Sequence, residues 1–328
     1  MKTKIIQGLK IALFFAVGVA FIWVFVAQLS DKEIDEMFFS VRKANYFWAV
    51  VAFVISVLSC YVRALRWRQM LKPMGYGKVS IHKAFLAIMS GYLTNLAVPR
   101  LGEVMRCAML RKSDGVPVEK SLGSVITERA IDLILFVFIF LIAVLMEFNV
   151  VNNYLKSSID RSIFDKIKLL ATVGVGICVI VIVLVLFVRR KFGNNKLYIR
   201  LRNLFAGFRQ GILSILHLEK PLLFVFYSLT IWLLWIAGTY AIFRCFEASS
   251  VLGFDVSVVV TALSAIGPMI TPGGIGLYPA IFAQTLLVYG VIRPIGYAAG
   301  WLSWLVSQLA SVVFGLAGFV YFSQNQKK

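Results

Sequence analysis

Long stretches without a charged residue constrain this chain more than any other feature of its sequence. Uncharged runs extend over 11–30, 44–62, 84–99, 133–146, 169–188, 221–243, 256–292 and 294–326. A helix that crosses ~30 Å of hydrocarbon needs about 20 apolar residues. Hydrophobic residues make up 60% of the chain and charged residues only 15%, whereas soluble domains carry about 25% charged residues. The sequence therefore predicts an all-α polytopic membrane protein.

Six of these runs are expected to form full transmembrane spans. Five have the required length directly, at 11–30, 44–62, 169–188, 221–243 and about 295–322. The run 133–146 becomes the sixth when it starts near Ala130 and tolerates Asp132 at its edge. The first run follows three lysines, but it is long and no small-residue cleavage site follows. We interpret it as an uncleaved span rather than a signal peptide.

Two runs do not fit a single crossing. The run 84–99 is short and ends in proline, and the run 256–292 is too long and is interrupted by prolines and glycines. Helices break at such residues, and irregular backbone at membrane depth persists only where protein or water covers it. We predict two re-entrant hairpins, with a kinked full span at either place as the alternative. The expected tips are Pro99 and Gly102 in the first hairpin, and Pro272, Gly273, Gly274 and Gly276 in the second.

The charge of the chain tests this arrangement. The sequence has 34 Lys and Arg against 15 Asp and Glu, a net charge of +19. With the N-terminus inside, six spans and two returning hairpins, 25 of the basic residues fall in cytoplasmic segments, in agreement with the positive-inside rule. A full crossing by 84–99 would move the basic residues of 100–129 outside. We predict a protein of the cytoplasmic membrane with both termini in the cytoplasm, and topology rather than nucleic-acid binding explains the basic charge.

The order of the elements predicts an inverted repeat within a single domain, 1–328. Each half reads span, span, hairpin, span, and an odd number of crossings inserts the second half upside down. The first repeat is expected over 1–150 and the second over 167–326. Inverted repeats with broken helices are typical of transporters. The segment 189–220 has apolar residues at helical spacing among basic ones, which predicts either a basic amphipathic cytoplasmic helix on anionic headgroups or a linker.

Ionisable residues gather beside the first hairpin. Arg100, Glu103 and Arg106 recur every three residues, so a helix after Pro99 would place them along one face. Ionisable groups at membrane depth are costly and face a cavity or one another. Arginine suits a phosphate because its planar fork donates two parallel hydrogen bonds. These residues therefore bind a lipid headgroup, or they form an ion network that pins the hairpin.

Glu128, Arg129 and Asp132 stand at the start of the following span. Spacings of three and four residues place them on neighbouring positions of a helix. They can pair with Arg106 or Arg100 across the hairpin, and a buried carboxylate can also take up a proton during transport. In the second hairpin, glycines before a helix allow close approach of a phosphate, or they form a tight turn only.

No cofactor or metal site is expected. The four cysteines lie far apart without metal-ligand spacing, and the two histidines are isolated. No motif of a soluble enzyme occurs, and the longest extramembrane stretch, 189–220, is too short for a catalytic domain.

Three motifs in this order resemble the flippase-like integral membrane family of lysylphosphatidylglycerol synthases. They are N-x-x-x-P-x-x-G-E-x-x-R over 95–106, E-R-x-x-D over 128–132 and P-G-G-x-G over 272–276, and the resemblance covers essentially the whole chain. In bifunctional relatives a C-terminal cytosolic domain transfers lysine to phosphatidylglycerol and the membrane part moves the product outward. This chain ends at Lys328 without such a domain, so the resemblance implies no synthesis of the lipid. Many relatives carry an acidic residue where this chain has Pro279.

Residues and resemblance together predict a flippase that is not an enzyme. Its cargo would be an anionic or aminoacylated phospholipid or a polyprenyl-phosphate-linked lipid. The expected headgroup ligands are Asn95, Arg100, Glu103, Arg106 and Arg129, and the expected coupling or ion-pair carboxylates are Glu103, Glu128 and Asp132.

Two other hypotheses stay open at this point. One is a membrane-embedded enzyme that modifies lipid headgroups with one of these carboxylates as acid or base. The other is a membrane subunit for a separate synthase or glycosyltransferase. The partners considered are membrane lipids, such a synthase or glycosyltransferase, and a second copy of the chain, but not nucleic acid.

Overall fold

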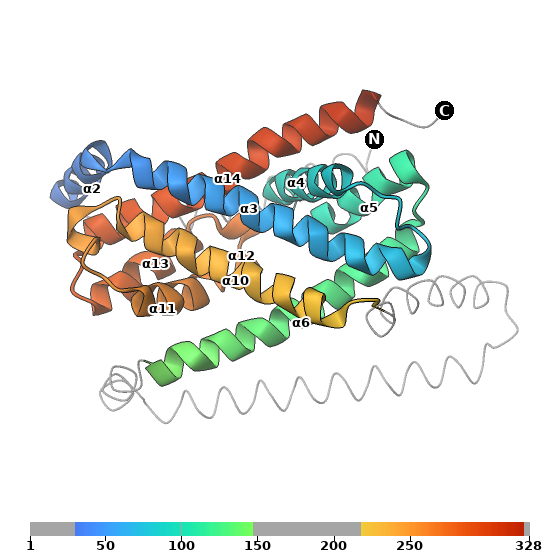
Figure 1. Ribbon diagram of the computed structural model, residues 1–328. Coiled ribbons are helices and arrows are strands. Elements are labelled where there is room, and N and C mark those ends of the chain that lie inside the picture. Colours follow the sequence, from blue (N-terminus) through green and yellow to red (C-terminus); the bar gives the residue numbers. More distant parts are fainter. Residues whose placement is uncertain (1–29, 99, 147–217, 325–328) are drawn as a thin grey trace, which may run out of the picture.

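The computed structural model describes residues 30–98, 100–146 and 218–324, and these residues form helices and turns without a strand (Figure 1). The helices are α2 (Asp31–Lys43), α3 (Tyr46–Leu71), α4 (Ile81–Ala97), α5 (Leu101–Asp114), α6 (Val118–Met146), α10 (Pro221–Phe243), α11 (Phe254–Ser264), α12 (Gly267–Ile270), α13 (Leu277–Val288) and α14 (Arg293–Gln324). Short 3-10 turns are η1 (Lys72–Met74), η3 (Glu247–Ser249) and η4 (Pro272–Gly274). The predicted spans 11–30, except Ser30, and 169–188 lie outside the described residues, as does nearly all of the loop 189–220.

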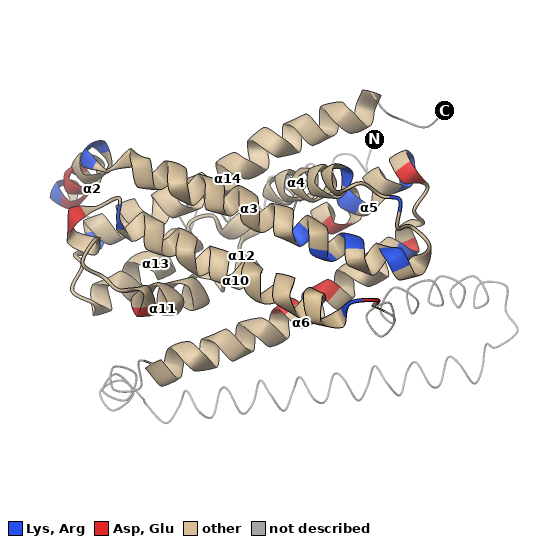
Figure 2. Cartoon of the chain, in the orientation of Figure 1, with Lys and Arg blue, Asp and Glu red and all other residues tan. Residues whose placement is uncertain are grey.

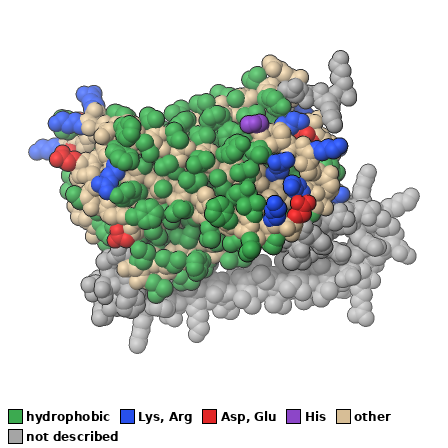
Figure 3. Space-filling view, in the orientation of Figure 1, with side chains coloured by type: hydrophobic (Ala, Val, Ile, Leu, Met, Phe, Trp, Pro, Cys, Tyr) green, Lys and Arg blue, Asp and Glu red, His purple; other side chains and the backbone are tan. Residues whose placement is uncertain are grey.

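Four of the described helices are long and apolar enough to cross a membrane: α3 with η1, α6, α10 and α14. They cover the predicted spans 44–62, 130–146, 221–243 and 295–322. Their outward side chains are apolar, for example Val54, Leu133, Phe226 and Leu316, which are 55–61% exposed. The space-filling view shows an apolar belt between two ends that carry the charges (Figures 2 and 3). The chain is a multi-pass integral membrane protein.

The predicted span 44–62 is shorter than the helix that the structure shows there. The prediction ended this span at residue 62, but α3 continues to Leu71 and contains Arg63 and Arg66 as buried residues. A charge usually ends an apolar run at the membrane surface. Here the arginines remain inside the bundle because carboxylates of α6 pair with them.

The first predicted break occurs between α4 and α5. Lys83 near the start of α4 pairs with Asp114 at the end of α5 at 2.9 Å, so the two helices are antiparallel. Their backbones approach closely, because a Cβ on Gly102 would lie 2.0 Å from the carbonyl oxygen of Gly91. The Asn95 carboxamide oxygen accepts a hydrogen bond from the Gly102 amide at 2.7 Å and closes the turn. Pro99, the predicted tip, lies outside the described residues.

The second predicted break occurs at η4, between α12 and α13. Gly273, Gly274 and Gly276 have positive φ angles of 58°, 78° and 73°, which glycine adopts without steric cost. The Gly273 carbonyl accepts hydrogen bonds from Trp304 Nε1 at 2.8 Å and Gln308 Nε2 at 3.4 Å, both on α14. A Cβ on Gly273 would lie 2.6 Å from the Cδ2 of Leu96. The two helix breaks therefore touch each other.

Helices from the N-terminal and C-terminal parts of the described chain pack against one another. α3 lies along α10, α4 contacts α5 and α14, and α11 contacts α13 and α6. α3 also contacts α4, and α10 contacts α11. In Figure 1 the α4–α5 pair and the α11–α13 pair lie toward opposite ends of the long helices. This arrangement places the α4–α5 turn and η4 in the middle of the molecule.

The Gly91–Gly102 approach gives a test of the first turn. Gly102→Ala places a methyl group against backbone that cannot move aside, so we expect loss of the folded protein or a fall of several degrees in its melting temperature. Gly238→Ala is the matched control, since a Cβ there meets only the Cγ2 of Ile55 at an ordinary 3.7 Å. Size-exclusion chromatography and thermal unfolding in detergent would measure both. Equal stability of the two variants would contradict the close packing of α4 on α5.

Candidate functional site

Two arginines of α3 meet two carboxylates of α6 inside the bundle. Arg63 Nη1 lies 2.8 Å from Glu128 Oε1 and 3.2 Å from Asp132 Oδ2. Arg66 Nη1 lies 2.7 Å from Asp132 Oδ1, and its Nη2 lies 3.2 Å from Glu128 Oε1. Both arginines are buried, as is Glu128. The charges are therefore compensated within the protein rather than by water.

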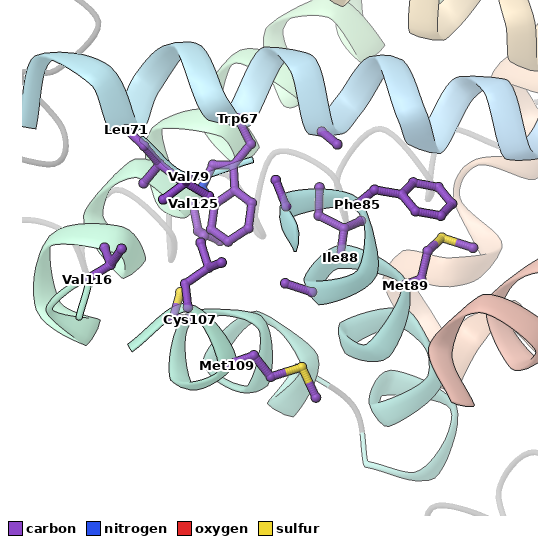
Figure 4. Close-up of a cluster of buried hydrophobic side chains, with 14 of the residues drawn as sticks. Trp67, Leu71, Val79, Phe85, Ile88, Met89, Cys107, Met109, Val116 and Val125 are labelled. Atoms are coloured by element: carbon purple, nitrogen blue, oxygen red, sulfur yellow. The ribbon is translucent and has the colours of Figure 1, made fainter. Parts of the chain in front are cut away.

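Arg106 brings a third guanidinium to the same carboxylate. Its Nη2 lies 3.1 Å from Glu128 Oε2, so Glu128 receives arginines from both α3 and α5. The Arg106 guanidinium also stands over the ring of Trp67 at 4.7 Å. The Trp67 side chain is fixed by its Nε1 hydrogen bond to Ser124 Oγ at 3.0 Å and by the apolar cluster drawn in Figure 4. A rigid aromatic ring thus orients Arg106 toward α6.

We call Arg63, Arg66, Arg106, Glu128 and Asp132 the buried ion cluster. Its three guanidinium groups and two carboxylates leave one positive charge in excess. α10 supplies neutral neighbours, because Arg63 stands 5.4 Å from the Trp235 ring and Arg66 5.7 Å from the Phe224 ring. An uncompensated charge at this depth is costly and indicates a functional site.

The buried ion cluster also has unused hydrogen-bonding capacity. The Nε atoms of Arg66 and Arg106 are buried and have no hydrogen-bond partner, and Arg66 Nη2 makes none with good geometry. A buried donor without a partner costs about 1–3 kcal/mol. Such donors can be satisfied by an anion that brings acceptor oxygens into the site.

A second ion pair lies at the surface beside the cluster. Arg129 Nη2 is 3.1 Å from Glu103 Oε1, and the two side chains are 43% and 22% exposed. This pair joins α6 to α5 next to the Arg106–Glu128 contact. The four residues alternate in charge across the α5–α6 contact.

The structure brings together some of the predicted site residues and separates others. Arg106 pairs with Glu128, as one predicted alternative had it. Arg100 makes no ion pair with the carboxylates of α6; it is exposed and occupies the N-cap position of α5 with a positive φ of 64° and no capping hydrogen bond from its side chain. Asn95 holds the turn through Gly102. In η4, a Cβ on Gly273 would meet Leu96, and one on Gly274 would meet Pro268 and Tyr278.

Sequence reasoning missed Arg63 and Arg66. Both lie beyond the predicted span 44–62, because the uncharged run ends at Val62. A signal was present, since Ala64, Trp67, Met70 and Leu71 continue the helical spacing of buried apolar residues beyond the first arginine. An apolar stripe that continues past a charge indicates a buried charge with a partner elsewhere.

Comparison with known proteins identifies the family. The model of the lysylphosphatidylglycerol synthase transmembrane region matches residues 9–321. The chain belongs to this family. The match includes the buried ion cluster, both helix breaks and the four long apolar helices except the last three residues of α14.

Two archaeal relatives match over nearly their whole length. One is a UPF0104 membrane protein of Methanothermobacter thermautotrophicus, 24% identical, with 96% of each chain covered. The other is a UPF0104 membrane protein of Methanocaldococcus jannaschii, 22% identical, with 92% of this chain and 93% of the relative covered. No solved structure matches the chain. The relatives are consistent with a stand-alone membrane domain of the lysylphosphatidylglycerol synthase family.

Glu128 offers the sharpest test of the cluster. Glu128→Gln leaves three buried guanidinium groups with Asp132 as their carboxylate, so we expect a loss of about 3–5 kcal/mol in the free energy of unfolding. Thermal unfolding and chromatographic recovery in detergent would measure the loss. Glu119→Gln on the same helix is the control and should unfold as the parent protein does.

A double variant separates charge balance from side-chain volume. Glu128→Gln with Arg106→Gln removes one charge of each sign and should recover part of the stability lost by Glu128→Gln alone. Additive losses would show that Arg106 and Glu128 are not coupled.

Proposed function

We propose that this protein moves a phosphate-bearing lipid between the two leaflets of the cytoplasmic membrane. The observation that carries the proposal is the buried ion cluster, with its excess positive charge and unpaired Nε donors, inside an apolar helix bundle. Ionisable groups at such a depth mark substrate or ion pathways. Lipid headgroups are the anions that a membrane supplies in quantity, and guanidinium groups suit their phosphates.

The cluster favours transport over headgroup chemistry. General acid–base catalysis needs a carboxylate within reach of the substrate and with a suitable pKa. Glu128 is ringed by three guanidinium groups, and Asp132 is paired with two. Glu103 is paired with Arg129. Carboxylates that are paired in this way balance the charge of the arginines and orient them. A binding site for an anion requires this arrangement, whereas an acid–base catalyst does not.

The proposal includes an inverted repeat with two re-entrant hairpins. In such a repeat each helix of the first half has a counterpart in the second: α10 for α3, α11 for α4, α13 for α5 and α14 for α6. When each helix is replaced by its counterpart, most pairs of helices in contact become other pairs that are also in contact. For example, the α4–α14 contact becomes the α11–α6 contact, and the α4–α5 pair becomes the α11–α13 pair. Such an exchange is what a two-fold relation between two halves produces. Inverted repeats place binding sites near the membrane midplane, at discontinuous helices.

Transport would use the contact between the two helix breaks. Leu96 lies against Gly273, and α14 fixes η4 through Trp304 and Gln308. Each hairpin would open toward its own side of the membrane while the other stays closed. The ion cluster lies beside the first hairpin. A headgroup would therefore enter it from the side of the membrane on which α4 begins and α5 ends.

A reconstitution experiment tests transport. Vesicles containing the purified chain should equilibrate a labelled phosphatidylglycerol or polyprenyl phosphate between leaflets faster than empty vesicles. Arg106→Lys keeps the charge but loses the planar fork, so the rate should fall about tenfold. Arg111→Lys, an exposed residue on the same helix, is the control and should transport normally.

Two results would contradict the proposal in different ways. If neither lipid class moves faster than in empty vesicles, the protein is not a transporter of these lipids. If mass spectrometry finds a lipid of changed composition after incubation, the protein is a headgroup-modifying enzyme.

The proposed orientation has its own test. Glu36 and Arg111 are exposed, and the helices that carry them, α2 and α5, lie toward opposite ends of the bundle in Figure 1. With the positive end in the cytoplasm, Glu36→Cys should react with an impermeant maleimide in intact cells, and Arg111→Cys only after permeabilisation. The parent chain with its native cysteines gives the baseline. The reverse pattern would place the α4–α5 hairpin on the outer side.

A further inference from the structure

The Glu103–Arg129 pair lies on a surface that faces lipid. Its neighbours on α5 are Leu101 and Val104, 41% and 42% exposed, and on α6 the nearby Ile126 and Leu133 are 41% and 55% exposed. Exposed apolar side chains of a multi-pass membrane protein contact hydrocarbon. We call the contact between α5 and α6 the α5–α6 seam. The pair is therefore a polar site where this seam meets the bilayer.

The pair also lies well within α6. Arg129 is 11 residues after Val118, the first residue of α6, and at ~1.5 Å per residue this is about 17 Å along the helix axis. An exposed ion pair in water contributes little to stability. Beside hydrocarbon, ionised side chains are rare and mark a substrate path.

A second ion pair continues directly behind the first. Arg106 follows Glu103 by one turn of α5, and Glu128 precedes Arg129 on α6. In the outer pair the arginine comes from α6, and in the inner pair it comes from α5. The crossed arrangement puts an arginine on each side of the seam, with a carboxylate opposite each.

Both pairs have atoms left without a partner. Arg106 Nε is a buried donor with no acceptor, and Glu103 Oε2 is a buried acceptor with no donor. The buried ion cluster carries one positive charge in excess, and the outer pair adds none. One negative charge at the seam would balance the whole set and satisfy the free Arg106 donor.

We infer that the α5–α6 seam is a binding site for a single phosphate group with one negative charge, entered sideways from the bilayer. Arg129 and Arg106 are its direct ligands, and Glu103 competes with the phosphate for Arg129. Arg63 and Arg66 are positioning residues, because they hold Glu128 and Asp132 away from the incoming anion. The inference rests on the proposed function where the phosphate belongs to a lipid, but the same chemistry would accept free phosphate.

Because Glu103 and the ligand compete for Arg129, substitution of Glu103 and substitution of Arg129 should change the binding affinity in opposite directions. The full chain in detergent would be titrated with phosphatidylglycerol, phosphatidylcholine and inorganic phosphate, with bound molecules counted by native mass spectrometry. Arg129→Gln should weaken phosphatidylglycerol binding about tenfold or more, since a charge-assisted hydrogen bond is lost. Glu103→Gln frees Arg129 and should strengthen binding several-fold.

Arg111→Gln is the matched control for general attraction of anionic lipid to the basic end of the protein. It removes an exposed charge from the same helix and should leave binding unchanged. A pair that only fastens α5 to α6 would make Glu103→Gln and Arg129→Gln shift binding in the same direction. That result, or equal binding by Arg129→Gln and Arg111→Gln, would overturn the inference.

The other arms identify the source of the phosphate. Preference for phosphatidylglycerol over phosphatidylcholine, without competition by millimolar inorganic phosphate, supports a lipid headgroup. Binding of inorganic phosphate with the same dependence on Arg129 and Glu103 supports the site with a soluble ligand. Binding is measured without vesicles, so intact transport with no seam binding would overturn this inference alone. Intact seam binding with no transport would overturn the proposed function alone.

Discussion

The rest of the molecule depends on the ion pairs that the Glu128 carboxylate makes. This carboxylate accepts guanidinium groups from α3 and α5 and is itself carried by α6, so one buried side chain joins three helices. Each arginine would be too costly at this depth without a carboxylate, and Glu128 would be too costly without them. The bilayer makes this interdependence strict, because no water is at hand to replace a missing partner. The second arm of the first hairpin is therefore attached to the bundle by charge.

The first arm is attached by close packing instead. α4 lies on α14, where a Cβ on Gly315 would fall 2.8 Å from the Cβ of Leu93, and one on Gly318 would fall 2.7 Å from the carbonyl oxygen of Leu86. Small residues let helices approach closely in membranes, where apolar surface alone gives no preference for protein over lipid. α4 is thus fixed to the second half of the chain and α5 to the first. A relative movement of the halves would act on the turn between them, which is where Leu96 meets Gly273.

Much of this architecture could be predicted from the sequence, and the failures share one physical cause. Four long spans and both helix breaks follow from uncharged runs and from proline and glycine, because backbone chemistry and bilayer thickness determine them locally. The positions of Arg63 and Arg66 could not be read in this way, since a charge ends an apolar run unless a partner from a distant helix holds it inside. Their carboxylate partners stand 62 or more residues away. Arg100 was grouped with Arg106 by spacing, yet it lies in the turn before α5 with a positive φ and stays exposed. Periodicity within one helix cannot reveal which face another helix will cover.

The N-terminal and C-terminal halves of the described chain differ in the number of charged side chains that they bury, and this difference bears on the proposed mechanism. Within the described residues, the buried charged side chains all belong to α3, α5 and α6. At the proposed counterpart of the α5–α6 contact, between α13 and α14, two neutral side chains are joined by a hydrogen bond, with the hydroxyl oxygens of Tyr278 and Ser303 2.9 Å apart. Two identical halves would offer a headgroup the same site from either leaflet. A charged half facing a neutral one offers a strong site on one side and a weak one on the other. Under the proposed inverted repeat, a headgroup would be captured beside α5 and α6 and released beside α13 and α14, so the unequal distribution of arginines would give binding a preferred direction.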